Sequence, residues 1–258
     1  MIKLSSFYSG VVAGLLCVSG QVCIAGSLKK QPEPTKVSKK IEPIRAIECD
    51  GSVRISLDGG GKSSVIFSTP NKKVQVARDK HTLKFTGSHD KTFTSDVIVY
   101  KKALKHVSEL KVMGACSVEG YDLHLPSLNL ITRSQGDVKL RGEIGAYAID
   151  QAGRNRVDVL WVDAKHVEAV VVDGELRLAG VTDHLNIKAF GGAKVKTRNL
   201  RAKGVWLLAS DTSYVDLFAS DMLSSFTSGH ANVVSRKRPS IISDVSKDSA
   251  IMVFEELD

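Results

Sequence analysis

Short apolar–polar–apolar triplets recur along the second half of the chain. One series has middle residues that lie 19, 19, 19 and 20 positions apart: Lys139, Asp158, Arg177, Lys196 and Asp216. A second series alternates with the first and is centred on Asn129, Ala148, Glu168, Asn186 and Trp206. Strand side chains alternate between two faces, so the flanking apolar residues of each triplet point inward and the middle one outward. The fixed period predicts an all-β fold, a right-handed parallel β-helix or solenoid with coils of about 19 residues.

The turns between the triplets leave one alternative open. The segment from Val170 to Leu178 carries Asp173-Gly174 at its centre, which is typical of a β-hairpin turn. Stacked β-hairpins are therefore the rival architecture. The coil is preferred because the period continues through Gly153-Arg154-Asn155, a poor hairpin turn.

In a solenoid, equivalent residues of successive coils lie beside one another, about 4.8 Å apart. The first series then forms an outward surface ladder, with one more member a coil earlier: Glu119, Lys139, Asp158, Arg177, Lys196 and Asp216. The signs of the charges mostly alternate, so neighbours attract one another. Each exposed pair contributes only about 0.2–1 kcal/mol.

The segments before and after the repeats do not show the period of 19 residues. We expect residues 44–100 to form an initial β unit that caps the N-terminal end, residues 101–235 to form the regular repeats and residues 236–258 to supply closing strands. Weak helical spacing from Lys101 to Lys111 indicates a connector at most.

The first 43 residues indicate export. Residues 1–25 have a basic start, an apolar centre and small residues at the end, as in a signal peptide, and residues 26–43 form a linker rich in Lys and Pro. An uncleaved membrane anchor is the alternative, and membrane contact is expected only through this segment. The expected location is periplasmic, cell-surface or extracellular.

Removal of the leader leaves two cysteines, Cys49 and Cys116. In an oxidising compartment they can pair, and the loop closed by that bond would contribute roughly 4 kcal/mol. Two separate buried thiols are the alternative, and the spacing matches no metal or redox motif.

No catalytic or cofactor motif stands out. Asp137 and Asp158 are the nearest candidates for a carboxylate pair, but the loops of the repeat are too short to build a cleft. His166 and His184 occupy equivalent positions in consecutive coils, with Asp163 and Asp183 nearby, yet a metal site needs three or four ligands in fixed geometry. We therefore expect no enzyme, no cofactor and no metal.

The formal net charge is +8, and aromatic residues make up 6% of the chain. A basic chain with few stacking platforms that is also exported does not fit nucleic acid, so anionic polysaccharide or an envelope protein is the expected partner. Oligomeric state stays open.

Three segments carry a resemblance to the GIN domain, the head domain of proteins classed as autotransporter adhesins: Cys49 to Leu57, Gly136 to Leu140, and Arg236 to Ile251. The resemblance covers Ile44 to about Phe254 and implies a parallel β-helix exported to the envelope. It brings no catalytic residues, and this chain departs from the pattern in having fewer Gly-Ser-Gly turns and more Lys and Arg. The expected function is a non-catalytic binding or adhesion module; the alternative is a polysaccharide-modifying enzyme with a groove along one face.

Overall fold

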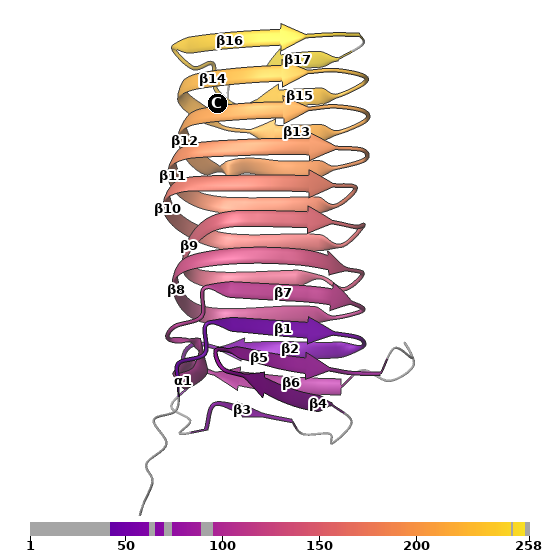
Figure 1. Cartoon of the computed structure of the whole chain (residues 1–258). Coiled ribbons are helices and arrows are strands. Elements are labelled where there is room, and N and C mark those ends of the chain that lie inside the picture. Colours follow the sequence, from indigo (N-terminus) through magenta and orange to yellow (C-terminus); the bar gives the residue numbers. More distant parts are fainter. Residues whose placement is uncertain (1–41, 62–64, 70–73, 89–94, 249, 256–258) are drawn as a thin grey trace, which may run out of the picture. The chain divides into compact units, whose positions relative to one another are not determined.

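The computed structural model describes residues 42–61, 65–69, 74–88, 95–248 and 250–255. The expected signal peptide and nearly all of the expected linker lie outside them. Residues Ile41–Asp258 form one compact unit. Its described part is mostly β-strand and winds into a right-handed solenoid (Figure 1).

The regular coils are built from long strands that each bend in the middle. The strands of this region are β7 (Glu109–Gly114), β8 (Ser117–Ser134), β9 (Val138–Ala152), β10 (Arg156–Val172), β11 (Glu175–Phe190) and β12 (Lys194–Ala209). Each of these strands pairs with the next in parallel. The alternative of stacked β-hairpins is therefore wrong, because hairpins would give antiparallel ladders.

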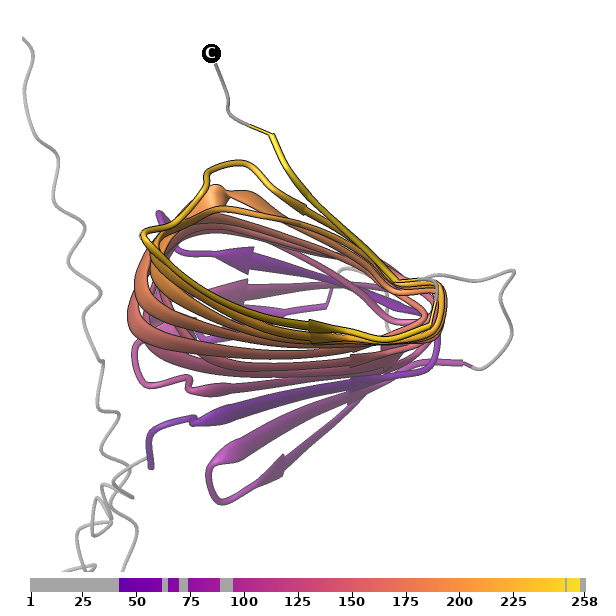
Figure 2. The same ribbon diagram turned by 90° about the horizontal axis from the view of Figure 1, so that it is seen from above.

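The coils have two flat faces and two unlike edges (Figure 2). We call face A the sheet formed by β7 and the second halves of β8 to β12, and face B the sheet formed by the first halves of β8 to β12. Both faces continue into the C-terminal strands, face A into β14 (Ala219–Thr227) and β16 (Ile241–Ser246), and face B into β13 (Tyr214–Leu217), β15 (Asn232–Ser235) and β17 (Ile251–Phe254). A tight turn joins A to B at one edge, and a broad bend joins B to A at the other.

Glycine makes the broad bend possible. Gly142 and Gly180 both have φ of +138°, a conformation that L side chains rarely adopt. A Cβ at either position would lie 2.2 or 2.1 Å from a backbone oxygen of the preceding coil. A side chain there would therefore push neighbouring coils apart.

Aspartate and glycine share the tight edge. Asp173 and Asp211 adopt positive φ, of 60° and 61°. Their carboxylates accept backbone hydrogen bonds at the turn between them, Asp173 from Gly192 N at 2.7 Å and Asp211 from Gly191 N at 3.0 Å. The acidic side chains therefore satisfy turn amides that the ladders leave unpaired.

The N-terminal coils do not follow the order of the sequence. This region contains β1 (Ala46–Asp50), β2 (Val53–Asp58), β3 (Phe67–Ser68), β4 (Gln75–Asp79), β5 (Thr82–Thr86), β6 (Ser95–Tyr100) and α1 (Lys101–Leu104). Strand β1 lies between β5 and β7, and β2 lies between β6 and β8. Strands β1 and β2 form the first coil along the chain. Strands β5 and β6 then pair with its outer side, and α1 leads the chain back to β7 on its inner side. Antiparallel β3 and β4 cover the outer end.

The inward side of the coils is mainly apolar, and one cluster of buried polar residues lies near the tight edge. There Asn155 Nδ2 donates to Thr132 Oγ1 at 3.0 Å, and Gln151 Nε2 donates to Asn155 O at 2.7 Å. These buried polar groups largely satisfy one another, as burial requires.

One residue breaks the predicted strand phase. Tyr147 was expected to face inward, as the first member of its triplet, but it is 61% exposed and Ala146 is buried instead. The ladder to β8 shifts here, pairing Leu128 with Ala146 and Asn129 with Ala148. The bulge leaves Tyr147 unpaired and turns its side chain outward.

Candidate functional site

Face B carries the charged ladder. Successive ladders pair Glu119 with Lys139, Lys139 with Asp158, Asp158 with Arg177, Arg177 with Lys196, and Lys196 with Asp216. The structure thus brings all six residues into one column along the solenoid axis, one from each coil.

The ion pairs around this column run mainly to residues that the sequence pattern did not single out. Asp158 Oδ1 is 3.9 Å from Nε of Arg177, its ladder neighbour, but only 2.9 Å from Nε of Arg156 on its own strand. Glu175 lies between Arg177, at 2.7 Å, and Lys196, at 3.0 Å. Arg156 and Glu175 do not belong to the series of residues with a period of 19. Each lies two positions before a member of that series on the same strand, so its side chain points to the same outward face.

Glu175 is held ionised by these neighbours. Partial burial alone would raise the pKa of its carboxyl, but hydrogen bonds from Lys196 and Arg177 outweigh that effect and lower the pKa below its ordinary value. At neutral pH the carboxylate therefore accepts one charge-assisted hydrogen bond from Arg177 on its own strand and one from Lys196 on the next coil.

Asp216 is not the exposed residue that the pattern predicted. Its side chain is only 5% exposed, because Arg236 covers it at 2.7 Å and Arg198 lies 3.7 Å away. Arg236 comes from the segment, residues 236–258, that was expected only to supply closing strands. Sequence spacing alone does not reveal this contact, since Arg236 belongs to no repeat position.

The ladder borders a polar hollow of about 530 Å³ on face B. Two of its lining residues are carboxylates, Asp158 and Asp216, and Tyr214 also lines it. Six are cations: Arg141, Arg156, Arg177, Lys196, Arg198 and Arg236. The excess of positive charge persists when Glu175, beside the hollow, is counted. Such a concentration of guanidinium groups attracts carboxylate, sulfate or phosphate groups.

A larger hollow, of about 610 Å³, lies at the broad edge. Its lining mixes apolar Val181 and Phe218 with an ion pair between Asp183 and Lys203 at 2.7 Å. The opposite charges compensate one another here, so this hollow has no comparable preference for charged ligands.

The two histidines singled out from the sequence lie on face A. His166 pairs with His184 in the ladder, and their ring centroids are 6.2 Å apart. Among the described residues, no group of three or more His, Cys, Asp or Glu side chains is arranged to hold a metal ion. Within the same residues, no helix has the length and apolarity needed to cross a membrane.

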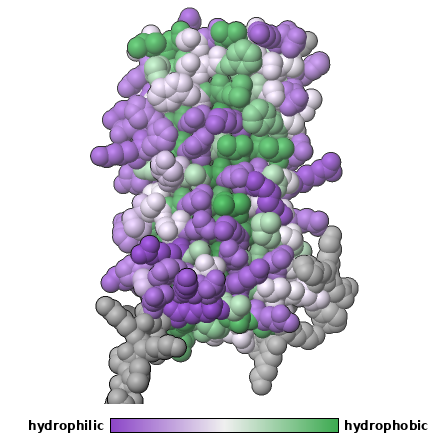
Figure 3. Space-filling model, viewed as in Figure 1, coloured by the Kyte–Doolittle hydropathy of each residue, from purple (hydrophilic) through white to green (hydrophobic). Residues whose placement is uncertain are grey.

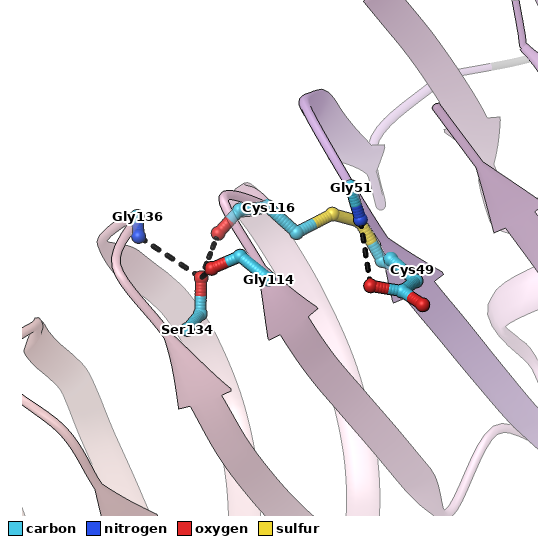
Figure 4. Close-up of a disulfide and its surroundings, with 7 residues drawn as sticks. Cys49, Gly51, Gly114, Cys116, Ser134 and Gly136 are labelled. Carbon is cyan, nitrogen blue, oxygen red and sulfur yellow. Dashed lines mark hydrogen bonds between the residues drawn. A yellow bond between two sulfur atoms is a disulfide. The ribbon is translucent and has the colours of Figure 1, made fainter. Parts of the chain in front are cut away.

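The two cysteines form a disulfide (Figure 4). Cys49 lies in β1 and Cys116 lies between β7 and β8; they are 67 positions apart in the sequence, with a Cα–Cα distance of 6.2 Å. Both side chains are fully buried. The bond therefore ties the inserted first coil to the regular repeats.

Three solved structures share this fold. The first, from Parabacteroides distasonis and described as a "putative lipid binding protein", has a TM-score of 0.66 at 16% identity and covers 83% of this chain and 94% of its own. A "putative adhesin" from Parabacteroides merdae has a TM-score of 0.65 at 14% identity, with 84% and 93% covered. Another from Bacteroides fragilis has a TM-score of 0.54 at 15% identity, with 84% and 94% covered. Identities this low establish the fold alone.

No curated protein sequence matches the chain. The sequence profile described as "Putative auto-transporter adhesin, head GIN domain" matches residues 43–239, which span most of the solenoid. The resemblance carried by Cys49 to Leu57 and by the repeated turns is thereby confirmed, and the chain belongs to the GIN domain family.

Proposed function

We propose that this protein is a non-catalytic binding module of the cell envelope, and that the basic hollow of face B binds an anionic polysaccharide. The observation that supports this most directly is the gathering of six cations around one polar hollow. Their side chains come from successive coils, so the positive surface follows the solenoid axis. A linear polymer with regularly spaced anionic groups can contact several coils at once.

The carboxylates of the hollow are poorly suited to catalysis. Asp216 accepts hydrogen bonds from Arg236 Nε and Nη2, and Asp158 accepts one from Arg156 Nε. Glycoside cleavage needs two carboxyl groups that are free to reach the sugar, and both of these are already engaged by guanidinium groups. The polysaccharide-modifying enzyme is therefore the weaker of the two functions.

Export is part of the proposal. It rests on the leader-like residues 1–25 and on the disulfide between Cys49 and Cys116, a bond that persists in oxidising compartments. Periplasm and cell surface both fit these features.

A pair of matched lysine variants tests the ligand. Lys196 lines the hollow on face B and is 3.0 Å from Glu175, whereas Lys188 lies on face A and is 3.0 Å from Glu168. Their side chains are exposed to similar extents, and Lys→Gln removes the same charge in each. Binding of polygalacturonate, with neutral dextran as the uncharged probe, is measured by calorimetry at two salt concentrations.

We expect Lys196→Gln to weaken polygalacturonate binding by up to about fivefold, the value of one exposed ion pair, and Lys188→Gln to leave it unchanged. Equal losses in both variants, or binding that disappears entirely at the higher salt concentration, would mean that general positive charge attracts the polymer and that the hollow is not a specific site.

A further inference from the structure

A column of rings runs along face A, on the opposite side of the solenoid from the basic hollow. The rings belong to four consecutive coils: Tyr147, His166, His184 and Trp206. Their centroids are 6.5, 6.2 and 5.4 Å apart in that order. Figure 3 views this face and shows hydrophobic residues interspersed with hydrophilic ones along its middle; His, Tyr and Trp themselves rank as hydrophilic on its scale. Face A also carries charged residues, such as the ion pair of Glu168 and Lys188, but the column of rings itself contains no carboxylate or ammonium group.

Trp206 ends the column with its indole leaning across the sheet. A Cβ added to Gly204 would lie 3.8 Å from Trp206 Cη2 and 3.4 Å from His184 Nδ1. The space above Gly204 is therefore occupied by the imidazole, the end of the Met222 side chain and the edge of the indole. Trp206 is 39% exposed although it lies in the middle of a sheet.

Beyond Trp206 the surface is hollowed. The next two residues in register are Ser224 and Ser243, whose short side chains leave a hollow of about 320 Å³. Phe226 and Asn186 lie at its sides. None of the residues that line it carries a charge. The hollow thus combines an aromatic wall with a floor of hydroxyl groups and one amide.

We propose that this hollow and the aromatic column bind a neutral glycan chain that runs along the solenoid axis. A sugar ring has an apolar C–H face that packs on an aromatic ring and hydroxyls that exchange hydrogen bonds with Ser and Asn. The uncharged lining matches an uncharged ligand, because the residues that line the hollow offer a charged group no ion pair in exchange for its lost hydration.

The repeat of the fold also fits such a ligand. Neighbouring coils are separated by about 4.8 Å, close to the length of one sugar ring in an extended chain. A glycan with one sugar on Trp206 therefore places the next over His184. An acyl chain fits less well, since it would cover the hydroxyls of Ser224 and Ser243 and the amide of Asn186 without bonding them.

The chain contains two tryptophans, which makes the test direct. Trp161 is 65% exposed, lies at the broad edge and lines no part of this hollow, so it supplies the matched control. In Trp161→Phe, Trp206 is the sole tryptophan, and its emission is followed while neutral cello-, malto- and chito-oligosaccharides of increasing length are added.

We expect a saturable change in emission with one of these series, an affinity that rises with chain length, and little effect of salt. Trp206→Ala should lower the affinity at least tenfold, and Trp161→Ala should leave it unchanged. Ser224→Leu, which fills the hollow and keeps Trp206, should lower it as well, so the outcome does not depend on the folding of one variant.

Several results would overturn the proposal. The first is the absence of saturable binding with every neutral oligosaccharide series. The second is an equal loss of affinity in Trp206→Ala and Trp161→Ala. The third is a change in Trp206 emission with phosphatidylcholine vesicles alone, which would make lipid the occupant. Binding of polygalacturonate to face B is measured separately in the Lys196 and Lys188 variants, so either site can fail without the other.

Discussion

Arg236 and Asp216 form a two-point ion pair across 20 positions of sequence, with Nε donating to Oδ1 at 2.7 Å and Nη2 to Oδ2 at 2.9 Å. Because both side chains are largely buried, the pair fixes the chain after β15 onto β13. The carboxylate of Asp216 raises the pKa of Arg236 further above its ordinary value by hydrogen bonding to it, so the arginine keeps its charge under all ordinary conditions.

Removal of the arginine leaves a buried carboxylate without its main partner. We expect Arg236→Leu to lower the free energy of unfolding by about 3 kcal/mol, measured by urea denaturation. The double variant Asp216→Leu/Arg236→Leu should lose less than the single one, because no unpaired charge remains. A double variant as unstable as the sum of the two single variants would show that the two side chains act independently.

Leu176 and Arg177 are adjacent but point to opposite sides of β11. Leu176 is fully buried, whereas Arg177 borders the face B hollow. Leu176→Asp places a carboxylate in the core and should prevent folding, while Arg177→Ala should cost less than about 1 kcal/mol. Far-UV circular dichroism and urea denaturation of the two variants compare the effects. Similar losses would contradict the assigned strand phase.

The period of 19 residues predicted the coil and its charged column because both follow from local alternation and stacking. The same alternation failed at Tyr147, where a bulge in the ladder to β8 shifts the phase by one residue. It also gave no sign that β1 lies between β5 and β7, since the N-terminal segment has no repeat that reports spatial order. The sequence did not reveal Arg236 as the ion-pair partner of Asp216 for a related reason. Arg236 lies outside the repeats, so its contact with a repeat residue does not recur at a fixed period.

The disulfide between Cys49 and Cys116 joins segments that come together only when the inserted coil is in place. Closing a loop of this length stabilises a fold by about 4 kcal/mol in the chain-entropy description. We expect Cys49→Ala/Cys116→Ala to unfold at a correspondingly lower urea concentration than the oxidised protein. Reductant should shift the unfolding midpoint of the parent protein and leave that of the double variant unchanged. A parent protein insensitive to reductant would show that the bond contributes little.

Glu175 makes part of the stability depend on pH. Its pKa in the folded protein is lowered, because the hydrogen bonds from Lys196 and Arg177 outweigh the effect of burial. Its contribution is therefore fully present above the unfolded pKa and is lost as the pH falls through the folded value. We expect Glu175→Gln to be less stable than the parent at pH 7 and the difference to shrink below pH of about 4. Urea denaturation across this range provides the measurement, and a difference independent of pH would show that the charge of Glu175 is not the cause.

Asp244 lies at an inward position of the last described coil, in register with buried Ser225, whose Oγ donates to Oδ1 of Asp244 at 2.6 Å. An inward-pointing charge at the end of a β-sheet opposes the addition of another strand, because that strand would bury it. Strand β16 has no partner among the described residues on its outer side, so this charge protects an open edge. We expect Asp244→Val to self-associate in a concentration-dependent manner, as measured by size-exclusion chromatography with light scattering. Ser243→Val adds the same side chain to the outer face of the same strand and should leave the association state unchanged. If both variants associate equally, added surface hydrophobicity is responsible and the inward charge has no protective role.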